Sequence, residues 1–211
     1  MDILDKIKDM PYFSRSDLIA LYYDKNYINI YVSRLIKNKT IIKLKRGIYT
    51  TTKYLESHRN NDSYIEFLAN HLITPSYLSE SYILKKHNIF TEHTYGVVSI
   101  TLKTTQSISN ELETFTYRNI THNLFRDIKV YQKDGFYISY APLHKALFDY
   151  FYFRQNKFPD SLDYIDSLRF NWENITIKDL NKMYLVCIKL KLEKMKKISQ
   201  LLIEFKEKYG N

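Results

Sequence analysis

The sequence predicts an α+β protein of two domains. Residues 1–55 form a small domain of three helices and a hairpin, and residues 56–211 form an α+β domain with a small antiparallel sheet and a helical C-terminus. Apolar residues recur at helical spacing up to about residue 38 and again after residue 142. Between these segments lie short β-prone runs, separated by turn residues. Four Gly and four Pro among 211 residues leave little room for linkers.

The first two helices are predicted from apolar spacing and a capping motif. Ile3, Leu4 and Ile7 recur at helical spacing, which predicts a helix over residues 2–9. Ser14 and Asp17 have the spacing of a capping box, with Asp in place of the usual Glu, so a second helix should begin there. Its buried stripe is expected to consist of Leu18, Ile19, Leu21 and Tyr22.

A third helix is predicted from about Asn29 to Asn38, after a polar turn at residues 24–27. Val32, Leu35 and Ile36 should face inward. The residues expected on the outer face are Asn29, Tyr31, Ser33, Arg34 and Lys37.

Two β-prone runs follow, at residues 41–44 and 47–50, joined by Lys45-Arg46-Gly47. Gly47 can adopt the positive φ that such a turn requires. Three helices and a hairpin are the layout of a winged helix-turn-helix domain, whose third helix enters the major groove of DNA. Arg34 and Asn29 are then the candidate base readers, since Arg suits guanine and Asn suits adenine. Lys43, Lys45 and Arg46 are candidate phosphate contacts.

The distribution of charge supports this interpretation more than the net charge of +9 does. Residues 1–53 carry 11 Lys/Arg and 5 Asp/Glu, whereas residues 54–211 carry 21 and 18. No acid occurs between Lys25 and Leu55, which predicts a local electropositive surface suited to phosphate. Two alternatives stay open: the domain mediates protein contacts with a solvated basic face, or Arg34 braces the wing through a salt bridge.

The larger domain is predicted to begin with helices, continue as a sheet and end as helices. Asp134-Gly135 is a strong hairpin signal between two of its strands. The predicted helices are 63–72, 79–87, 142–154, 161–170, 177–190 and 192–209, and the predicted strands are 97–102, 115–117, 128–131 and 136–140.

No catalytic constellation is recognisable. The six histidines include no pair at i, i+4, no glycine-rich phosphate loop occurs, and Cys187 lies among apolar residues as a buried filler would. Asp160, Asp163 and Asp166 could suggest a metal site, but their spacing at threes is more typical of a solvated helix face. We therefore expect no enzyme activity, no catalytic residues, no metal and no cofactor.

The sequence also predicts no membrane segment and a cytoplasmic location. The longest apolar run, residues 146–153, is interrupted by Asp149 and is far shorter than a membrane span. The N-terminus has no apolar signal core.

Four motifs, taken in order, resemble the AbiEi family of antitoxins, which are transcriptional regulators of bacterial abortive-infection systems. The resemblance covers about residues 13–154. The motifs are Arg46-Gly47-Ile48-Tyr49 in the hairpin, Pro75-Ser76-Tyr77-Leu78-Ser79, Thr116-Tyr117-Arg118-Asn119-Ile120, and Ala141-Pro142-Leu143-His144-Lys145-Ala146-Leu147-Phe148-Asp149. His144 departs from the family pattern, which has Glu at this position, so any role of that acid is in doubt here.

The resemblance implies a winged domain that represses its own operon by binding its promoter DNA. It also implies a second domain that neutralises a nucleotidyltransferase-like toxin as a type IV antitoxin, without needing a stable complex. The positions worth testing in that domain are Ser76, Tyr77, Ser79, Lys145 and Asp149. Each also has a structural interpretation: Ser79 as an N-cap, Tyr77 as a core ring with a tethered hydroxyl, and Lys145 with Asp149 as an i, i+4 pair.

Two further function classes remain as alternatives. One is an interaction protein that binds the toxin directly and has a vestigial winged domain. The other is a nuclease or nucleotidyltransferase accessory that acts on bound nucleic acid through Asp160, Asp163 or Asp166.

Overall fold

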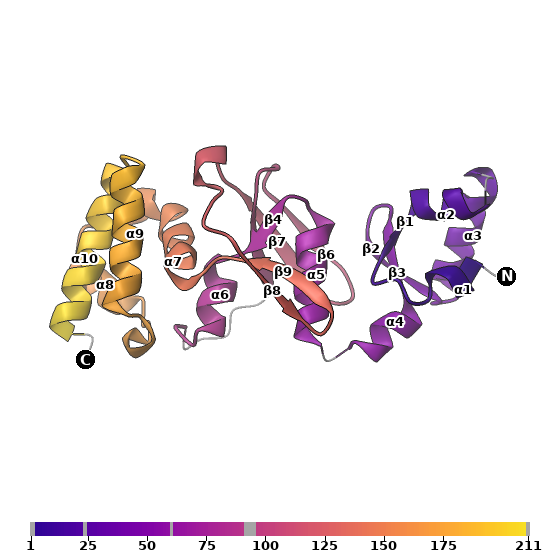
Figure 1. Cartoon of the computed structure of the whole chain (residues 1–211), viewed down its shortest axis with the longest axis horizontal. Coiled ribbons are helices and arrows are strands. Elements are labelled where there is room, and N and C mark those ends of the chain that lie inside the picture. Colours follow the sequence, from indigo (N-terminus) through magenta and orange to yellow (C-terminus); the bar gives the residue numbers. More distant parts are fainter. Residues whose placement is uncertain (1–2, 23–24, 60, 91–95, 210–211) are drawn as a thin grey trace.

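The computed structural model describes residues 3–22, 25–59, 61–90 and 96–209. These residues form ten α-helices and two sheets, which confirms an α+β protein with a helical C-terminus. The molecule is elongated, with the two ends of the chain at opposite tips and a large sheet near the middle (Figure 1). Within the described part of the chain, none of the helices combines the length and the apolar character that crossing a membrane requires.

The N-terminal part contains three helices and a small antiparallel sheet. Its elements are α1 (Ile3–Ile7), β1 (Phe13–Ser14), α2 (Arg15–Tyr22), α3 (Lys25–Lys37), β2 (Ile41–Lys45) and β3 (Ile48–Thr51), with strand order β1-β3-β2. The predicted capping box is confirmed: the amide of Ser14 donates to Asp17 Oδ2 at 2.6 Å, and the amide of Asp17 donates to Ser14 Oγ at 3.2 Å. The two-residue strand β1 is too short to have a sequence signal.

The start of α3 and its inward face differ from the prediction. The helix begins at Lys25, so residues 25–27 of the predicted turn belong to it, whereas residues 23–24 lie outside the described residues. Ile28, Val32 and Leu35 share its buried face, four and then three residues apart. The prediction that Ile36 faces inward is wrong, because Ile36 follows the buried Leu35 by about 100° of helix rotation and is 39% exposed.

The C-terminal part is built around the larger sheet. Its helices are α5 (Asp62–Leu72), α6 (Glu80–Lys86), α7 (Leu143–Tyr152), α8 (Leu162–Ser167), α9 (Ile177–Lys189) and α10 (Glu193–Tyr209), and its strands are β4 (Ser76–Leu78), β5 (Val97–Thr101), β6 (Gln106–Ser109), β7 (Thr114–Asn119), β8 (Lys129–Lys133) and β9 (Phe136–Tyr140). Between the two parts, α4 (Thr52–Ser57) follows β3 and packs against it. Helix α4 runs across the predicted domain boundary at residues 55 and 56.

The prediction of a small antiparallel sheet is wrong, because the sheet is mixed and has six strands in the order β6-β7-β5-β4-β9-β8. Strand β5 pairs parallel with β7, and β4 meets β9 in parallel at Leu78 and Tyr140. Two strands of this sheet were not predicted. Strand β4 is buried throughout and therefore has no alternating pattern, and β6 lies between β5 and β7 along the chain and pairs with β7 at the edge of the sheet, so that β7 runs parallel to β5. The hairpin of β8 and β9 is confirmed, and Asp134 and Gly135 both have the positive φ of its turn.

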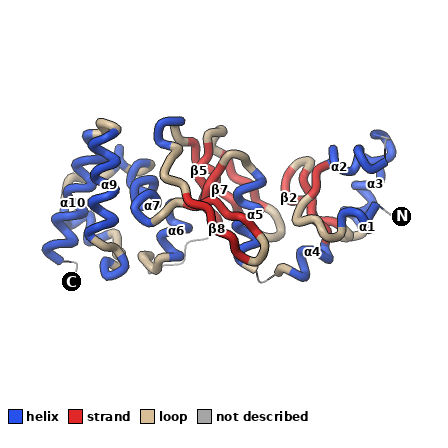
Figure 2. The backbone as a smooth tube through the Cα atoms, in the orientation of Figure 1, coloured by secondary structure: helices blue, strands red, loops and turns tan. Residues whose placement is uncertain are grey.

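Helices cover both faces of this sheet. Helix α5 lies on the side nearer the N-terminal part, and α6 and α7 lie on the other side, with α8–α10 beyond them (Figures 1 and 2). One hydrophobic core extends from α5 through the sheet to α10, and a second, smaller core lies among α1–α3 and the small sheet.

Candidate functional site

The exposed face of α3 brings together four of the five residues predicted on its outer face, including both candidate base readers. Asn29, Ser33, Arg34 and Lys37 are all exposed and line a shallow depression of about 360 Å³ with Ile30. Residues 30, 33, 34 and 37 follow i, i+3, i+4, i+7 spacing, so they form one stripe of the helix surface. Helix α3 lies at the end of the molecule away from the large sheet (Figure 1). We call this stripe, with Asn29, the α3 face.

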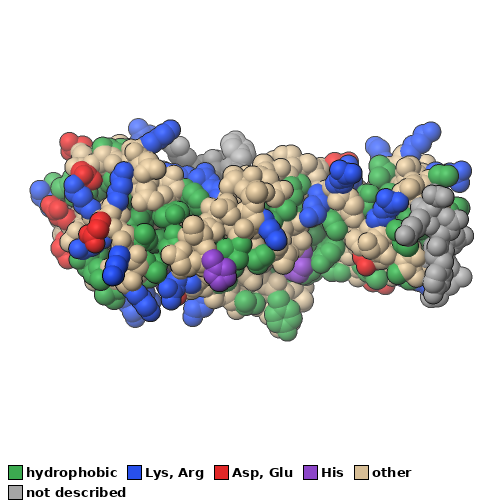
Figure 3. Space-filling model, turned by 90° about the horizontal axis from the view of Figure 1, so that it is seen from above, with side chains coloured by type: hydrophobic (Ala, Val, Ile, Leu, Met, Phe, Trp, Pro, Cys, Tyr) green, Lys and Arg blue, Asp and Glu red, His purple; other side chains and the backbone are tan. Residues whose placement is uncertain are grey.

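Two predicted outer residues of α3 have contacts within the protein. The hydroxyl of Ser33 donates to the carbonyl of Asn29 at 2.9 Å. Tyr31 is half-buried, packs against the smaller core and stacks on Tyr27 with ring centroids 5.9 Å apart. The cations Arg34 and Lys37 therefore dominate the chemistry of the α3 face. From above, Lys and Arg side chains predominate over the N-terminal part, whereas acids and bases mix over the C-terminal helices (Figure 3).

The hairpin of β2 and β3 lies between α1–α3 and the large sheet (Figure 1). Lys43 and Arg46 are exposed as predicted. Lys45 is half-buried, its ammonium donates to the carbonyl of Leu72 at the end of α5, and burial lowers its pKa. Lys45 thus joins the two parts of the chain, and we leave it out of the candidate phosphate contacts.

Other contacts hold the hairpin in this position. Leu44 belongs to the larger core, and its carbonyl accepts a hydrogen bond from Asn110 Nδ2 at 2.9 Å. The hydroxyl of Tyr64, on α5, donates to the carbonyl of Pro11 at 2.6 Å and lies 3.0 Å from Thr50 Oγ1.

Replacement of Lys45 should destabilise the protein. Lys45→Ala leaves the carbonyl of Leu72 without this donor, and we expect a loss of about 1 kcal/mol in the free energy of unfolding, measured by urea denaturation. Lys43→Ala, on the same strand and exposed, is the matched control and should change stability by less than ~0.5 kcal/mol. Equal effects of the two substitutions would contradict the tethering role of Lys45.

Four of the five residues singled out in the second domain meet at one buried carboxylate. Asp149 Oδ1 accepts from Lys145 Nζ at 2.6 Å, and Asp149 Oδ2 accepts from the hydroxyls of Ser79 at 2.7 Å and Tyr77 at 3.0 Å. Lys145 also donates to the carbonyl of Leu124 at 2.9 Å. None of the four side chains is more than 2% exposed. Burial raises the pKa of Asp149, and its three donors oppose that rise.

This arrangement favours the structural interpretation of these residues. Tyr77 is a core ring with a tethered hydroxyl, and Lys145 pairs with Asp149 four residues later. Ser79 precedes α6, but its hydroxyl bonds Asp149 and makes no capping bond. The fifth residue, Ser76, lies apart on β4, 8% exposed, and its hydroxyl donates to carbonyls of α5.

His144 lies on the first turn of α7, beside this network, and is half-buried. Burial and the charge of Lys182 lower the pKa of its imidazole, while Asp127 and Asp179 act in the opposite direction. The lowered pKa disfavours the charged imidazolium at this position.

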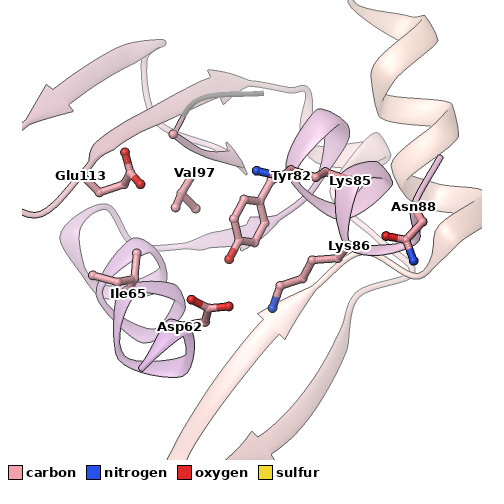
Figure 4. Close-up of a pocket in the computed structure, with 9 residues that line it drawn as sticks. Asp62, Ile65, Tyr82, Lys85, Lys86, Asn88, Val97 and Glu113 are labelled. Carbon is pink, nitrogen blue, oxygen red and sulfur yellow. The ribbon is translucent and has the colours of Figure 1, made fainter. Parts of the chain in front are cut away.

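A second polar cluster, which the sequence did not predict, centres on Glu66. This fully buried carboxylate is bonded by Lys86 and by the hydroxyls of Tyr82 and Tyr131. Tyr82 and Lys86 project from α6 toward α5 at a pocket of about 330 Å³ that Asp62 and Ile65 also line (Figure 4). Because Glu66 already engages Lys86 and the hydroxyls of Tyr82 and Tyr131, the cluster joins α5, α6 and β8.

The three aspartates of the metal alternative do not gather. Asp160 pairs with Lys197, whereas Asp163 and Asp166 line a different surface hollow beside Phe205 and Tyr209. Among the residues that the structure describes, no three His, Cys, Asp or Glu side chains are grouped so that they could hold a metal ion. Cys187 is buried, as predicted.

Comparison with known proteins adds no assignment. No protein-family model matches the chain, and no curated protein is similar to it. The resemblance to AbiEi antitoxins therefore rests on the motifs alone and stays a prediction.

Proposed function

We propose that this protein binds double-stranded DNA through the α3 face and regulates transcription from its own promoter. The observation that carries the proposal is the α3 face itself. It combines two exposed cations with amide and hydroxyl groups, has no acid among its described residues, and lies at the end of the molecule away from the large sheet. This chemistry fits double-stranded DNA, which is a polyanion and presents polar base edges in a groove wide enough for a helix.

In this proposal the N-terminal part is a winged helix-turn-helix domain with α3 as its recognition helix. Arg34 and Asn29 read base edges, and Lys37 contacts phosphate. Of the hairpin, only Lys43 and Arg46 remain available for phosphates, because Lys45 binds Leu72.

We further propose that residues 56–211 form the antitoxin domain that the AbiEi-like motifs imply, acting in the cytoplasm against a nucleotidyltransferase-like toxin. Residues of two of those motifs meet at Asp149, which supports their belonging to one structural unit. Since this network is buried, its role in the proposal is to shape the domain and not to contact the toxin. The chain acts by binding and has no catalytic role.

A gel-shift titration against the DNA upstream of the protein's own coding sequence tests the DNA-binding role. We expect tight binding that weakens with salt and is preferred over a scrambled duplex. Arg34→Ala should weaken specific binding by roughly 5- to 150-fold, corresponding to ~1–3 kcal/mol, and relax specificity. Lys37→Ala should weaken binding to all duplexes and reduce the salt slope by ~0.9.

Lys45→Ala is the matched control, since it also removes a cation from the N-terminal part but should leave the salt slope unchanged. No preference for the upstream DNA at low salt would contradict the repressor role. If the protein then co-purifies as a stable complex with a toxin expressed from the neighbouring gene, the direct toxin-binding alternative is favoured.

A further inference from the structure

Ile30 is the unusual residue of the α3 face. Its side chain is 55% exposed, more than any other large hydrophobic side chain described in the N-terminal part. Ile28, Val32 and Leu35 fill the smaller core from the other side of α3, so Ile30 is not needed there. Its i, i+3, i+4, i+7 spacing with Ser33, Arg34 and Lys37 is present in the sequence, but an isoleucine at such a position more commonly belongs to a core.

The neighbours of Ile30 determine what can cover it. Among the residues that the structure describes, those lining this depression include Arg34 and Lys37 and no acidic side chain. A surface that covers Ile30 must therefore tolerate two cations, which favours a polyanion over the apolar surface of another protein. Ile30 also lies in the first half of α3, and recognition helices contact base edges with their N-terminal residues.

Among the major-groove edges of the four bases, the C5 methyl of thymine is the group suited to an apolar contact. An isoleucine cannot donate or accept a hydrogen bond, so it can distinguish bases there only through this methyl group. We propose that Ile30 is a specificity-determining residue that reads thymine by packing on its C5 methyl. This inference rests on the proposed DNA-binding function. It names thymine as the base that the apolar part of the α3 face selects.

Uracil interference tests the inference directly. The upstream duplex is prepared with a fraction of its thymines replaced by deoxyuridine, which keeps base pairing and phosphates but removes the methyl group. The duplex is incubated with the full-length protein, and gel electrophoresis separates bound from free duplex. The positions of uracil are then mapped in both fractions. We expect one or two positions at which uracil weakens binding about fourfold, the effect of losing one methyl-sized apolar contact.

Ile30→Ala should bind the all-thymine duplex about tenfold more weakly and lose its sensitivity to uracil at those positions, because the two changes remove the same contact. Ile36→Ala is the matched control, since Ile36 is exposed on α3 but does not line the depression, and this variant should keep the parent's uracil sensitivity.

If Ile30→Ala keeps that sensitivity, or if no position is sensitive although the parent protein binds, the thymine inference is overturned and the DNA-binding function stands. If the parent binds no duplex, both are overturned.

Discussion

Asp149→Asn is expected to lower the free energy of unfolding by about 3–5 kcal/mol, because it removes one partner of a buried ion pair. Lys145 is 2% exposed, and its ammonium also donates a hydrogen bond to the carbonyl of Leu124. The asparagine can still accept from Ser79 and Tyr77, so most of the loss should come from the ammonium left without its counter-charge. Urea denaturation monitored by circular dichroism measures the change.

A double-mutant cycle separates this charge effect from a simple loss of packing. Lys145→Met fills a similar volume without the charge, so Asp149→Asn combined with Lys145→Met should be less destabilised than the sum of the two single variants, by ~1 kcal/mol or more. Asp160→Asn is the matched control. It breaks the ion pair of Asp160 with Lys197, in which the Lys197 side chain is 59% exposed and the Asp160 side chain is 48% exposed. This substitution should change the free energy of unfolding by less than ~1 kcal/mol. Additive single effects would contradict coupling between Lys145 and Asp149.

Of the contacts that Asp149 makes, the one with Lys145 could be predicted from the sequence, and those with Tyr77 and Ser79 could not. Tyr77 and Ser79 precede Asp149 by about seventy residues, and only the pairing of β4 with β5 and β9 brings them to α7. The i, i+4 pairing of Lys145 with Asp149 was predictable, because one helix fixes it. Their burial was not, since a charged pair on a helix is usually solvated.

Local signals predicted the existence of the three N-terminal helices, although the start of α3 and the position of Ile36 were predicted wrongly, and long-range packing limited the rest. The capping box of Ser14 and Asp17 depends on four consecutive residues and was readable. The burial of Lys45 depends on its hydrogen bond to the carbonyl of Leu72, which is 27 residues away in the sequence. A local sequence pattern does not contain this information. The mixed sheet was missed for the same reason, because parallel pairing of β5 with β7 is decided by the path of the intervening chain.

Ile28→Ala should unfold the N-terminal part selectively and abolish DNA binding while the second domain stays folded. Ile28 is fully buried in the smaller core, where truncation of Ile to Ala typically costs 2–5 kcal/mol. That core is small, so a loss of about this size is a large share of the stability it can provide. The larger core, from α5 to α10, has no contact with Ile28 and should retain its packing.

Hydrogen exchange followed by mass spectrometry distinguishes selective from global unfolding. In Ile28→Ala, amides of residues 3–51 should lose protection, whereas those of residues 62–209 should keep it. Ile36→Ala provides the matched control, since it removes the same atoms from an exposed position of the same helix and should stay within ~0.5 kcal/mol of the parent. Equal loss of protection in both segments would mean that Tyr64, Leu44 and Lys45 couple the two parts into one cooperative unit, and the predicted division at residues 55 and 56 would then not describe how the protein unfolds.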